Sequence, residues 1–298
     1  MAWRTVVVSN PAKLRVQNDQ LVIQQQTAVN LPVEDISVLV LESPEVTLSS
    51  ALLDRLAQHG VTLFACDRRH LPSLIATPFA SHSRLAGIQR MQLDASIPFQ
   101  KRCWQTIIKR KIANQARCLE LLGNTTSKRV GTLVSHVLSG DSGNAESTAA
   151  RVYFQAAFGL AFNRSEEDTL NHALNYGYAI MRGAVARGLT GHGFITSLGI
   201  HHRSELNQFN LADDFIEPLR PVVDLCAANM SLGGELTKSN REKLVALLHA
   251  DVLVDGKCHA VHYAAELMAA SFLAACREKD ARLLKLPQLL PLKMHEYE

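Results

Sequence analysis

The spacing of apolar residues changes once along this chain, near residue 80, and that change limits the fold more than any other feature. Before it, short runs rich in β-branched residues often alternate apolar with polar positions, as half-buried strands do. From about residue 84 onward, apolar residues recur every three or four positions, the period of amphipathic helices. A chain of 298 residues is also long for a single domain. We therefore predict an α+β fold, with a small β-rich domain over residues 1–78 and a larger all-helical domain over residues 79–298.

Local signals place the expected elements of the first domain. The pair Asn18-Asp19 separates two alternating runs and predicts a tight hairpin connection. A short helix is expected over residues 48–59, with Thr47 or Ser49 as its cap. The expected strands cover residues 5–9, 13–17, 20–25, 36–41 and 61–66.

Two further segments have weaker patterns. The β pattern stops over residues 72–78, and the tail over residues 286–298 contains two prolines and is expected to be irregular.

Between these two segments, a long helical stripe includes small residues that permit close packing of helices. This stripe comprises Leu170, Leu174, Gly177, Met181, Ala184, Val185 and Gly188.

Positive charge is concentrated in one stretch of the chain. Residues 81–140 carry ten Lys and Arg against two Asp and Glu, whereas the formal net charge of the whole chain is only +3. Such asymmetry is typical of a surface that contacts phosphate backbones, although a solvated helix face would give the same count. The basic residues are Arg84, Arg90, Lys101, Arg102, Lys109, Arg110, Lys111, Arg117, Lys128 and Arg129.

Several classes of protein and site are excluded. The six cysteines form no CxxC pair, which indicates reduced thiols and a cytoplasmic protein. No apolar run reaches the roughly 18 residues that span a bilayer, so no membrane association is expected. Cys258 and His262 lie four residues apart but lack a second ligand pair, so we expect no zinc site there. The chain also lacks a P-loop, a dinucleotide fingerprint and a GxSxG motif.

Glu146 is the first candidate functional residue. In a helix, its carboxylate shares a face with several alanines and with Tyr153, so it lies within an apolar stripe. Burying an unpaired carboxylate is costly, and a cation or strong hydrogen-bond donors should therefore meet it. Alternatively, Asn144 caps the helix and Glu146 lies in the first turn, where acidic residues favour the helix dipole.

Residues 199–224 contain a second candidate group, in which two histidines precede an acidic helix that begins near Asn210. Asp214 and Glu217 are spaced i and i+3, so they are neighbours along one edge of the buried face, whereas Asp213 points outward and is expected to be solvated. Carboxylates with one imidazole suit Mg²⁺ or Mn²⁺, and the imidazole favours Mn²⁺. The buried face is expected to contain Leu211, Phe215, Leu219, Val222 and Val223.

At these residues the sequence resembles the integrase of the CRISPR adaptation machinery, the enzyme that inserts new spacers into a repeat array. The shared pattern is a Glu followed by small residues and Tyr-Phe, then a His, then a short acidic helix ending in D-x-x-E-P-x-R-P. The likeness extends over essentially the whole chain and is strongest to the type II branch, which accompanies a large RNA-guided nuclease. The matching segments are VVVSNPAKL near the start, AESTAARVYF around Glu146, LNYGYAI at 174–180, GIHH at 199–202 and NLADDFIEPLRPVVD at 210–224.

The resemblance implies which residues act. Glu146, His202 and Glu217 are the implied catalytic residues, which hold one divalent ion, Mg²⁺ or Mn²⁺. His202 is preferred to His201 because the characteristic histidine of the family lies twelve residues before the position that Asp214 matches. Asp214 is implied either to support the ligands from behind or to act as an alternative ligand.

The resemblance also implies partners. Members of this family form homodimers through the β domain, and two such dimers flank a small companion protein and hold a short duplex. We therefore expect double-stranded DNA, both spacer precursor and repeat array, a second copy of this chain and the companion adaptation protein as partners. The RNA-guided effector nuclease is a further possible partner.

The implied reaction is metal-assisted phosphoryl transfer, in which a DNA 3′-hydroxyl attacks a phosphodiester of the repeat. Water as nucleophile at the same site would cut DNA, so a stand-alone repair nuclease is the first alternative. A non-enzymatic DNA-binding scaffold, with the acidic helix as a solvated face, is the second. The reaction product distinguishes the integrase, which yields joined DNA, from the nuclease, which yields only cut strands. A lack of metal dependence would indicate the DNA-binding scaffold.

Overall fold

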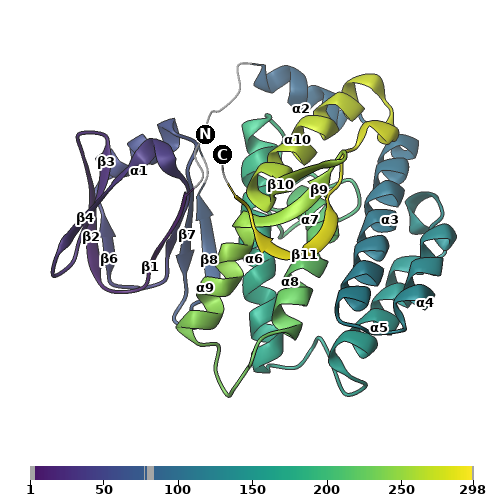
Figure 1. Cartoon of the computed structure of the whole chain (residues 1–298). Coiled ribbons are helices and arrows are strands. Elements are labelled where there is room, and N and C mark those ends of the chain that lie inside the picture. The colour runs from purple at the N-terminus through teal and green to yellow at the C-terminus, as the bar shows by residue number, and fades with distance from the viewer. Residues whose placement is uncertain (1–3, 77, 79–83, 297–298) are drawn as a thin grey trace. The chain divides into compact units, whose positions relative to one another are not determined.

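The computed structural model describes residues 4–76, 78 and 84–296, and the chain divides into two compact units (Figure 1). These units are Met1–Ser83 and Arg84–Glu298. The first is β-rich and the second is mostly helical, so the predicted α+β class is confirmed. The predicted boundary after residue 78 adjoins residues 79–83, which lie outside the described residues.

The described part of the first unit contains two four-stranded sheets. In one, of order β1-β5-β7-β8, the first three strands are parallel and β8 is antiparallel to β7. In the other, of order β4-β3-β2-β6, antiparallel pairs end in a parallel pair between β2 and β6. The strands are β1 Arg4–Val8, β2 Ala12–Gln17, β3 Gln20–Gln24, β4 Ala28–Pro32, β5 Ile36–Leu41, β6 Val46–Leu48, β7 Thr62–Cys66 and β8 Pro72–Ala76.

A shared apolar core joins these sheets to the helix α1, Ser50–Gln58. Leu14 and Leu39 come from different sheets, and both pack in this core with Leu52 of α1. Ser49 caps α1 by accepting a hydrogen bond from the Leu52 N–H at 3.3 Å, which confirms one of the two predicted caps. The predicted hairpin between β2 and β3 is also confirmed.

Helices dominate the described part of the second unit. Its central element is α3, Ile97–Leu121, which packs against α4, α5 and α8, while α6, Thr169–Gly191, packs against α7, α8, α9 and α10. The other helices are α2 Leu85–Leu93, α4 Ser127–Thr132, α5 Ala145–Phe158, α7 Asn210–Ile216, α8 Arg220–Ala228, α9 Lys238–Ala246 and α10 Val261–Glu278. Single 3₁₀ turns are η1 Val33–Asp35 in the first unit and η2 Leu133–His136, η3 Ser139–Asp141, η4 Glu217–Leu219, η5 Leu247–His249 and η6 Ala281–Leu283 in the second.

Two glycines of α6 allow its neighbours to approach closely. A Cβ at Gly177 would lie 2.4 Å from Val223 Cγ1 of α8. A Cβ at Gly188 would lie 2.9 Å from the carbonyl oxygen of Ala265 in α10. Both distances are too short for a side chain, so the predicted role of the small-residue stripe in close packing is confirmed.

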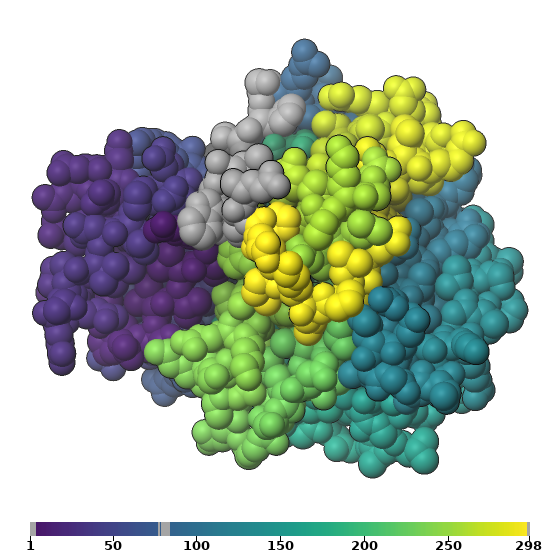
Figure 2. Space-filling model, viewed as in Figure 1, coloured from purple at the N-terminus to yellow at the C-terminus, as the bar shows by residue number. Residues whose placement is uncertain are grey.

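The second unit is not all-helical, because it contains a three-stranded sheet of order β10-β9-β11. Its strands are β9 Ala250–Val254, β10 Lys257–Ala260 and β11 Gln288–Met294. The prediction of an irregular tail was therefore wrong for β11, and the prediction that the β pattern stops at residue 72 was wrong for β8. Figure 2 shows the sheet of the second unit, in yellow-green and yellow, at the surface.

Candidate active site

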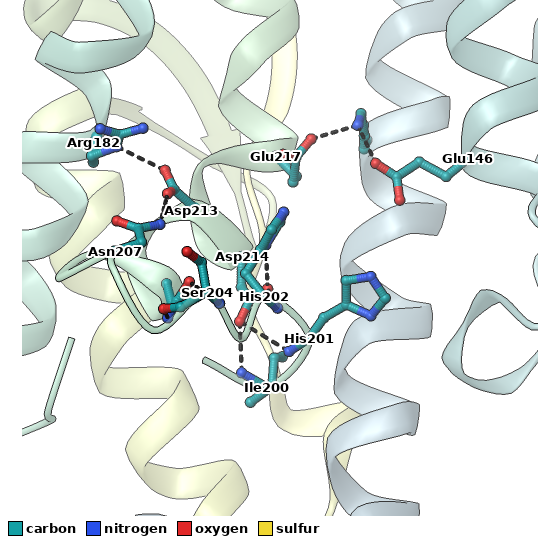
Figure 3. A network of polar contacts seen from close by, with 12 residues as sticks. Glu146, Arg182, Ile200, His201, His202, Ser204, Asn207, Asp213, Asp214 and Glu217 are labelled. Atoms are coloured by element: carbon teal, nitrogen blue, oxygen red, sulfur yellow. Dashed lines mark hydrogen bonds and ion pairs between the residues drawn. The ribbon is translucent and has the colours of Figure 1, made fainter. Parts of the chain in front are cut away.

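The four predicted site residues lie together in the second unit, although separate segments supply them (Figure 3). Glu146 is in the first turn of α5, and His202 is in the loop that precedes α7. Asp214 is within α7, and Glu217 begins η4. Lys111 of α3 connects the two glutamates, as described next.

Lys111 places one ammonium group between Glu146 and Glu217. Its Nζ lies 2.6 Å from Glu146 Oε1 and 2.5 Å from Glu217 Oε2. Burial would lower the pKa of Lys111, but the charges of Glu217 and Glu146 outweigh burial and raise it. The lysine is therefore charged, and the two carboxylates converge on a single cationic position.

Glu146 is held at this position by the start of its helix. Asp141, rather than Asn144, caps α5: its carboxylate accepts hydrogen bonds from the Ala145 and Glu146 N–H groups, each at 3.0 Å. Asn144 adopts a left-handed conformation and makes no side-chain cap. The predicted position in the first helical turn is correct, and the expected cation beside the carboxylate is the Lys111 ammonium.

Glu217 lies where the acidic helix is interrupted. Pro218 follows it, α7 ends at Ile216, and a 3₁₀ turn connects to α8. The carbonyl of Pro218 accepts a hydrogen bond from Asn114 Nδ2 at 2.7 Å, which satisfies this part of the buried backbone. The break turns the Glu217 side chain toward α3, as Figure 3 shows.

Two cations fix the charge of Glu217. Arg220 Nε donates to its Oε1 at 2.8 Å, and Lys111 approaches its Oε2. Burial alone would raise the pKa of Glu217, but Arg220 and Lys111 lower it to about 2. The guanidinium of Arg220 is itself stacked over the Tyr178 ring, 4.6 Å from its centroid.

Asp214 organises the histidine loop from inside the protein. Its fully buried carboxylate accepts hydrogen bonds from the N–H groups of Ile200, His201 and His202, at 2.6, 3.2 and 3.0 Å. It also accepts a hydrogen bond from His202 Nδ1 at 2.8 Å. The three backbone bonds hold the loop in place, and the fourth bond orients the ring of His202. The Nε2 atom of this ring is therefore the nitrogen that is available to a ligand.

Gly199 allows this arrangement, since a Cβ there would lie 2.7 Å from Asp214 Oδ2 and 2.4 Å from the His202 carbonyl oxygen. The hydrogen bond with Asp214 raises the pKa of His202 despite partial burial, and the charge of Glu217 adds to the increase. His201 has a different environment. Its ring stacks on Trp104 with the two centroids 4.0 Å apart.

The prediction that Asp213 is solvated was wrong. Asp213 is only 6% exposed, accepts a hydrogen bond from Arg182 Nε at 2.7 Å and accepts another from Asn207 Nδ2 at 2.7 Å. The reason is that α7 is buried on all sides, so the outward face of this short helix meets α6 rather than solvent. Asp213 therefore belongs to a neighbouring structural ion pair.

Lys111 is the site residue that the sequence did not reveal as such, since it was counted among the basic residues of a phosphate-contacting surface or a solvated helix face. A signal was available: Lys111 follows Ile107 by four residues and Trp104 by seven, so it lies on the apolar face of α3. A lysine on a buried helix face requires a partner of opposite charge. Glu146 and Glu217 are those partners.

The side chains present suit a hard divalent cation. Two carboxylates with one imidazole nitrogen form a mainly oxygen ligand set of the kind that Mg²⁺ and Mn²⁺ accept. Glu217 Oε2 is buried and has the ion pair with Lys111 but no hydrogen bond of good geometry among the described residues, so it can accept a cation. A closer group of three metal-ligating atoms, within 4.8 Å of one another, lies elsewhere in the described chain, at Asp251, Cys258 and His295.

The comparison with protein families gives one match over most of the chain, to "CRISPR associated protein Cas1" across residues 5–250. A CRISPR-associated endonuclease Cas1 from Neisseria meningitidis serogroup C (strain 8013) is 44% identical over 304 residues, with all of both chains covered. No helix in the described residues combines the length and apolar character that crossing a bilayer requires.

Solved structures share the fold at low sequence identity. A casposase bound to its integration product has a TM-score of 0.77 at 17% identity, covering 93% of this chain and 92% of that chain. A Cas6-RT-Cas1–Cas2 complex contains a chain with a TM-score of 0.73 at 19% identity, covering 97% of this chain and 36% of that one. The predicted family and enzyme class are thus confirmed: the chain belongs to the Cas1 family of CRISPR-associated proteins and is an enzyme of its endonuclease class.

Proposed function

We propose that this enzyme inserts short DNA duplexes into a CRISPR repeat array by metal-dependent strand transfer at the site around Lys111. The observation that carries the proposal is the convergence of two carboxylates, 71 positions apart in the sequence, on one cationic position. Glu217 is 3% exposed and the Lys111 side chain is 9% exposed, whereas the Glu146 side chain is 26% exposed, so this position is shielded from solvent on the Glu217 side. Such shielding strengthens electrostatic effects on a phosphodiester.

Glu146, Glu217 and His202 Nε2 would hold one Mg²⁺ or Mn²⁺ ion. When bound, the ion supplies Lewis-acid polarisation of a phosphate and a template for in-line attack by a 3′-hydroxyl. Glu217 is ionised throughout the working pH range because its pKa is about 2. It therefore offers a carboxylate ligand without first losing a proton.

Asp214 acts through His202 in this proposal. A carboxylate that accepts the Nδ1 proton fixes the tautomer of the imidazole and makes Nε2 a better ligand. Because all four of its hydrogen bonds come from the loop at residues 200–202, Asp214 is a positioning residue rather than an alternative ligand.

Lys111 holds the two glutamate side chains close together because its positive charge offsets their negative charges. Without a cation, two carboxylates in a buried site repel one another, and the site would open or take up protons. Lys111 and Arg220 together balance the two carboxylates before any metal binds. At Glu217 Oε2 the ammonium occupies the place that a bound metal ion would share or take.

The basic residues of α2, α3 and α4 remain candidates for contact with double-stranded DNA. Those other than Lys111 are at least partly exposed, so they can reach phosphates. We infer a second copy of this chain, joined through the β-rich unit, and a small companion adaptation protein as partners, since one structural neighbour is a Cas1–Cas2 complex. The RNA-guided effector nuclease is a further inferred partner. The cysteines of the described chain are free thiols, which suits a cytoplasmic location.

A strand-transfer assay tests the proposal. Labelled short duplexes with free 3′-hydroxyls are mixed with supercoiled plasmid that carries a repeat, in Mn²⁺, Mg²⁺ or EDTA, with and without the companion protein. We expect covalent transfer of the label in either metal, with none in EDTA and none for His202→Ala. Glu217→Gln should abolish joining while leaving duplex binding nearly intact.

The alternatives give other products. Metal-dependent cutting without transfer, with the companion present, would favour a stand-alone nuclease. Binding with no metal-dependent product would favour a DNA-binding scaffold. Full activity of Glu217→Gln would remove Glu217 from the site.

A further inference from the structure

The small sheet of the second unit brings together three metal-ligating side chains that play no part in the site around Lys111. Asp251 is in β9, Cys258 is in β10, and His295 directly follows β11. One ligand atom from each residue lies within 4.8 Å of the other two. The three atoms are a carboxylate oxygen, a thiol sulfur and an imidazole nitrogen.

Strand pairing fixes this grouping. In the antiparallel pair of β9 and β10, Asp251 pairs with Ala260 and Leu253 pairs with Cys258, so Asp251 and Cys258 are diagonal neighbours on one face of the sheet. On the other side of β9, the N–H of His295 donates to the carbonyl of His249 at 2.7 Å. Backbone hydrogen bonds therefore hold all three residues before any ligand binds.

The three side chains already interact. His295 Nδ1 lies 2.7 Å from Asp251 Oδ1. Cys258 in turn is hydrogen-bonded to Asp251. Lys293 is turned toward Glu296, with which it forms an ion pair at 2.9 Å. Cys258 is exposed, so an ion from solvent can reach the group.

We propose that Asp251, Cys258 and His295 form a site for a zinc-type transition-metal ion, separate from the catalytic ion. Zn²⁺ binds thiolate, imidazole and carboxylate at about 2.0–2.3 Å, so small side-chain rotations bring three atoms already within 4.8 Å around one centre. The thiolate disfavours Mg²⁺ and selects softer ions. Binding releases the thiol proton of Cys258 to solvent, and a water molecule completes the fourth position.

This site differs from the pair Cys258 and His262 that the sequence suggested and that we rejected. His262, in α10, is 7% exposed, and its Nδ1 lies 3.0 Å from the carbonyl oxygen of Leu248 in η5. The partners of Cys258 instead come from strands that pair across the sheet. The proposed ion would link β11, the last strand of the described residues, to the hairpin of β9 and β10.

Cobalt substitution of the full-length protein tests the inference. Co²⁺ bound by a thiolate gives a near-ultraviolet sulfur-to-metal charge-transfer band together with visible bands of tetrahedral cobalt. We expect these bands in the wild type, loss of the charge-transfer band in Cys258→Ser, and retention of both in Cys66→Ser, a partly exposed cysteine of the other unit. A missing band in the wild type, or an unchanged band in Cys258→Ser, would overturn the proposal.

Zinc affinity provides a second measurement that does not depend on the cysteine variant. Competition with a chromophoric chelator should show zinc binding at least about tenfold weaker in His295→Gln than in the wild type, because a direct ligand contributes at least as much as a supporting residue. His59→Gln, a histidine of the first unit, is the control and should retain wild-type affinity. Equal zinc affinity in His295→Gln and the wild type would contradict the site.

Discussion

The Lys111 ammonium lies 2.5 Å from Glu217 Oε2, and both groups are nearly enclosed by protein. A buried carboxylate of this kind needs a permanent counter-ion, because an isolated charge in the interior is costly. The same ammonium reaches Glu146 at 2.6 Å. The enzyme therefore carries its own cation at the place where we propose that a metal ion binds.

Replacing Lys111 by Met should destabilise the metal-free enzyme and make it more dependent on metal. The substitution leaves Glu146 and Glu217 facing each other without the ammonium, and we expect a loss of about 3 kcal/mol in the free energy of unfolding in EDTA. Urea unfolding with EDTA or Mn²⁺ measures this. Mn²⁺ should recover more stability in the variant than in the wild type, since it no longer competes with a lysine.

Lys109→Met is the matched control, because Lys109 is on the same helix but is partly exposed. It should change stability in EDTA by less than about 0.5 kcal/mol. If Lys111→Met were as stable as Lys109→Met and responded equally to Mn²⁺, the bridging role of Lys111 would be wrong.

The stability that Glu217 contributes should depend on acid pH. Its pKa is lowered from 4.5 to about 2 in the folded protein, so its contribution is fully present above about pH 4.5 and disappears as pH falls toward 2. The difference in unfolding free energy between wild type and Glu217→Gln should therefore shrink by about 3 kcal/mol over that window. Urea unfolding in EDTA at a series of pH values measures it. Glu235→Gln, at an exposed site, should show no such change, and a pH-independent difference for Glu217→Gln would refute the argument.

The sequence predicted well those helices and strands whose apolar residues follow a clear local period. The strand over residues 36–41 has the predicted bounds, and the buried face of the acidic helix contains the five apolar residues expected there. Several strands were missed, among them β6, β9 and β10, which contain no proline, and β8 and β11, which do. Pro72 begins β8 and Pro291 lies within β11, and both strands are at sheet edges, where proline without an N–H is tolerated. Which strands lie at an edge follows from tertiary pairing, which the sequence does not state.

The prediction of the candidate site was also limited by tertiary contacts that the sequence does not give. The family resemblance implied that Glu146, His202 and Glu217 act together, but it gave no hint of Lys111, which lies between the two glutamates and belongs to another helix. Lys111 was counted with the basic residues of a DNA surface or a solvated helix face, because its position on the apolar face of α3 was not considered. Asp213 was assigned to solvent because a helix with one apolar stripe was assumed, whereas α7 is enclosed on all sides. Both errors concern which neighbour covers a helix.

Asp214→Asn should weaken metal binding without abolishing folding. An amide at this position replaces one acceptor oxygen by a donor, so the hydrogen bond from His202 Nδ1 or those from the loop N–H groups are lost. We expect Mn²⁺ affinity, measured by electron paramagnetic resonance, and strand joining to fall by about 10- to 100-fold. Asp213→Asn is the control, since Asp213 is a buried carboxylate that pairs with Arg182 instead. It should lose stability while retaining Mn²⁺ affinity, and equal effects of both variants on Mn²⁺ affinity would contradict the role of Asp214.

Gly199→Ala should disturb the same loop by adding a single methyl group. The new Cβ would lie 2.4 Å from the His202 carbonyl oxygen and 2.7 Å from Asp214 Oδ2, so the backbone that positions His202 must move. We expect a loss of about 1–3 kcal/mol in unfolding free energy together with weaker Mn²⁺ binding, because overpacking here displaces the groups that orient the imidazole. Gly233→Ala is the matched control, since a Cβ at Gly233 would meet nothing within 4 Å. Its stability and Mn²⁺ affinity should match the wild type. Unchanged Mn²⁺ affinity in Gly199→Ala would show that the ring of His202 does not depend on this close approach.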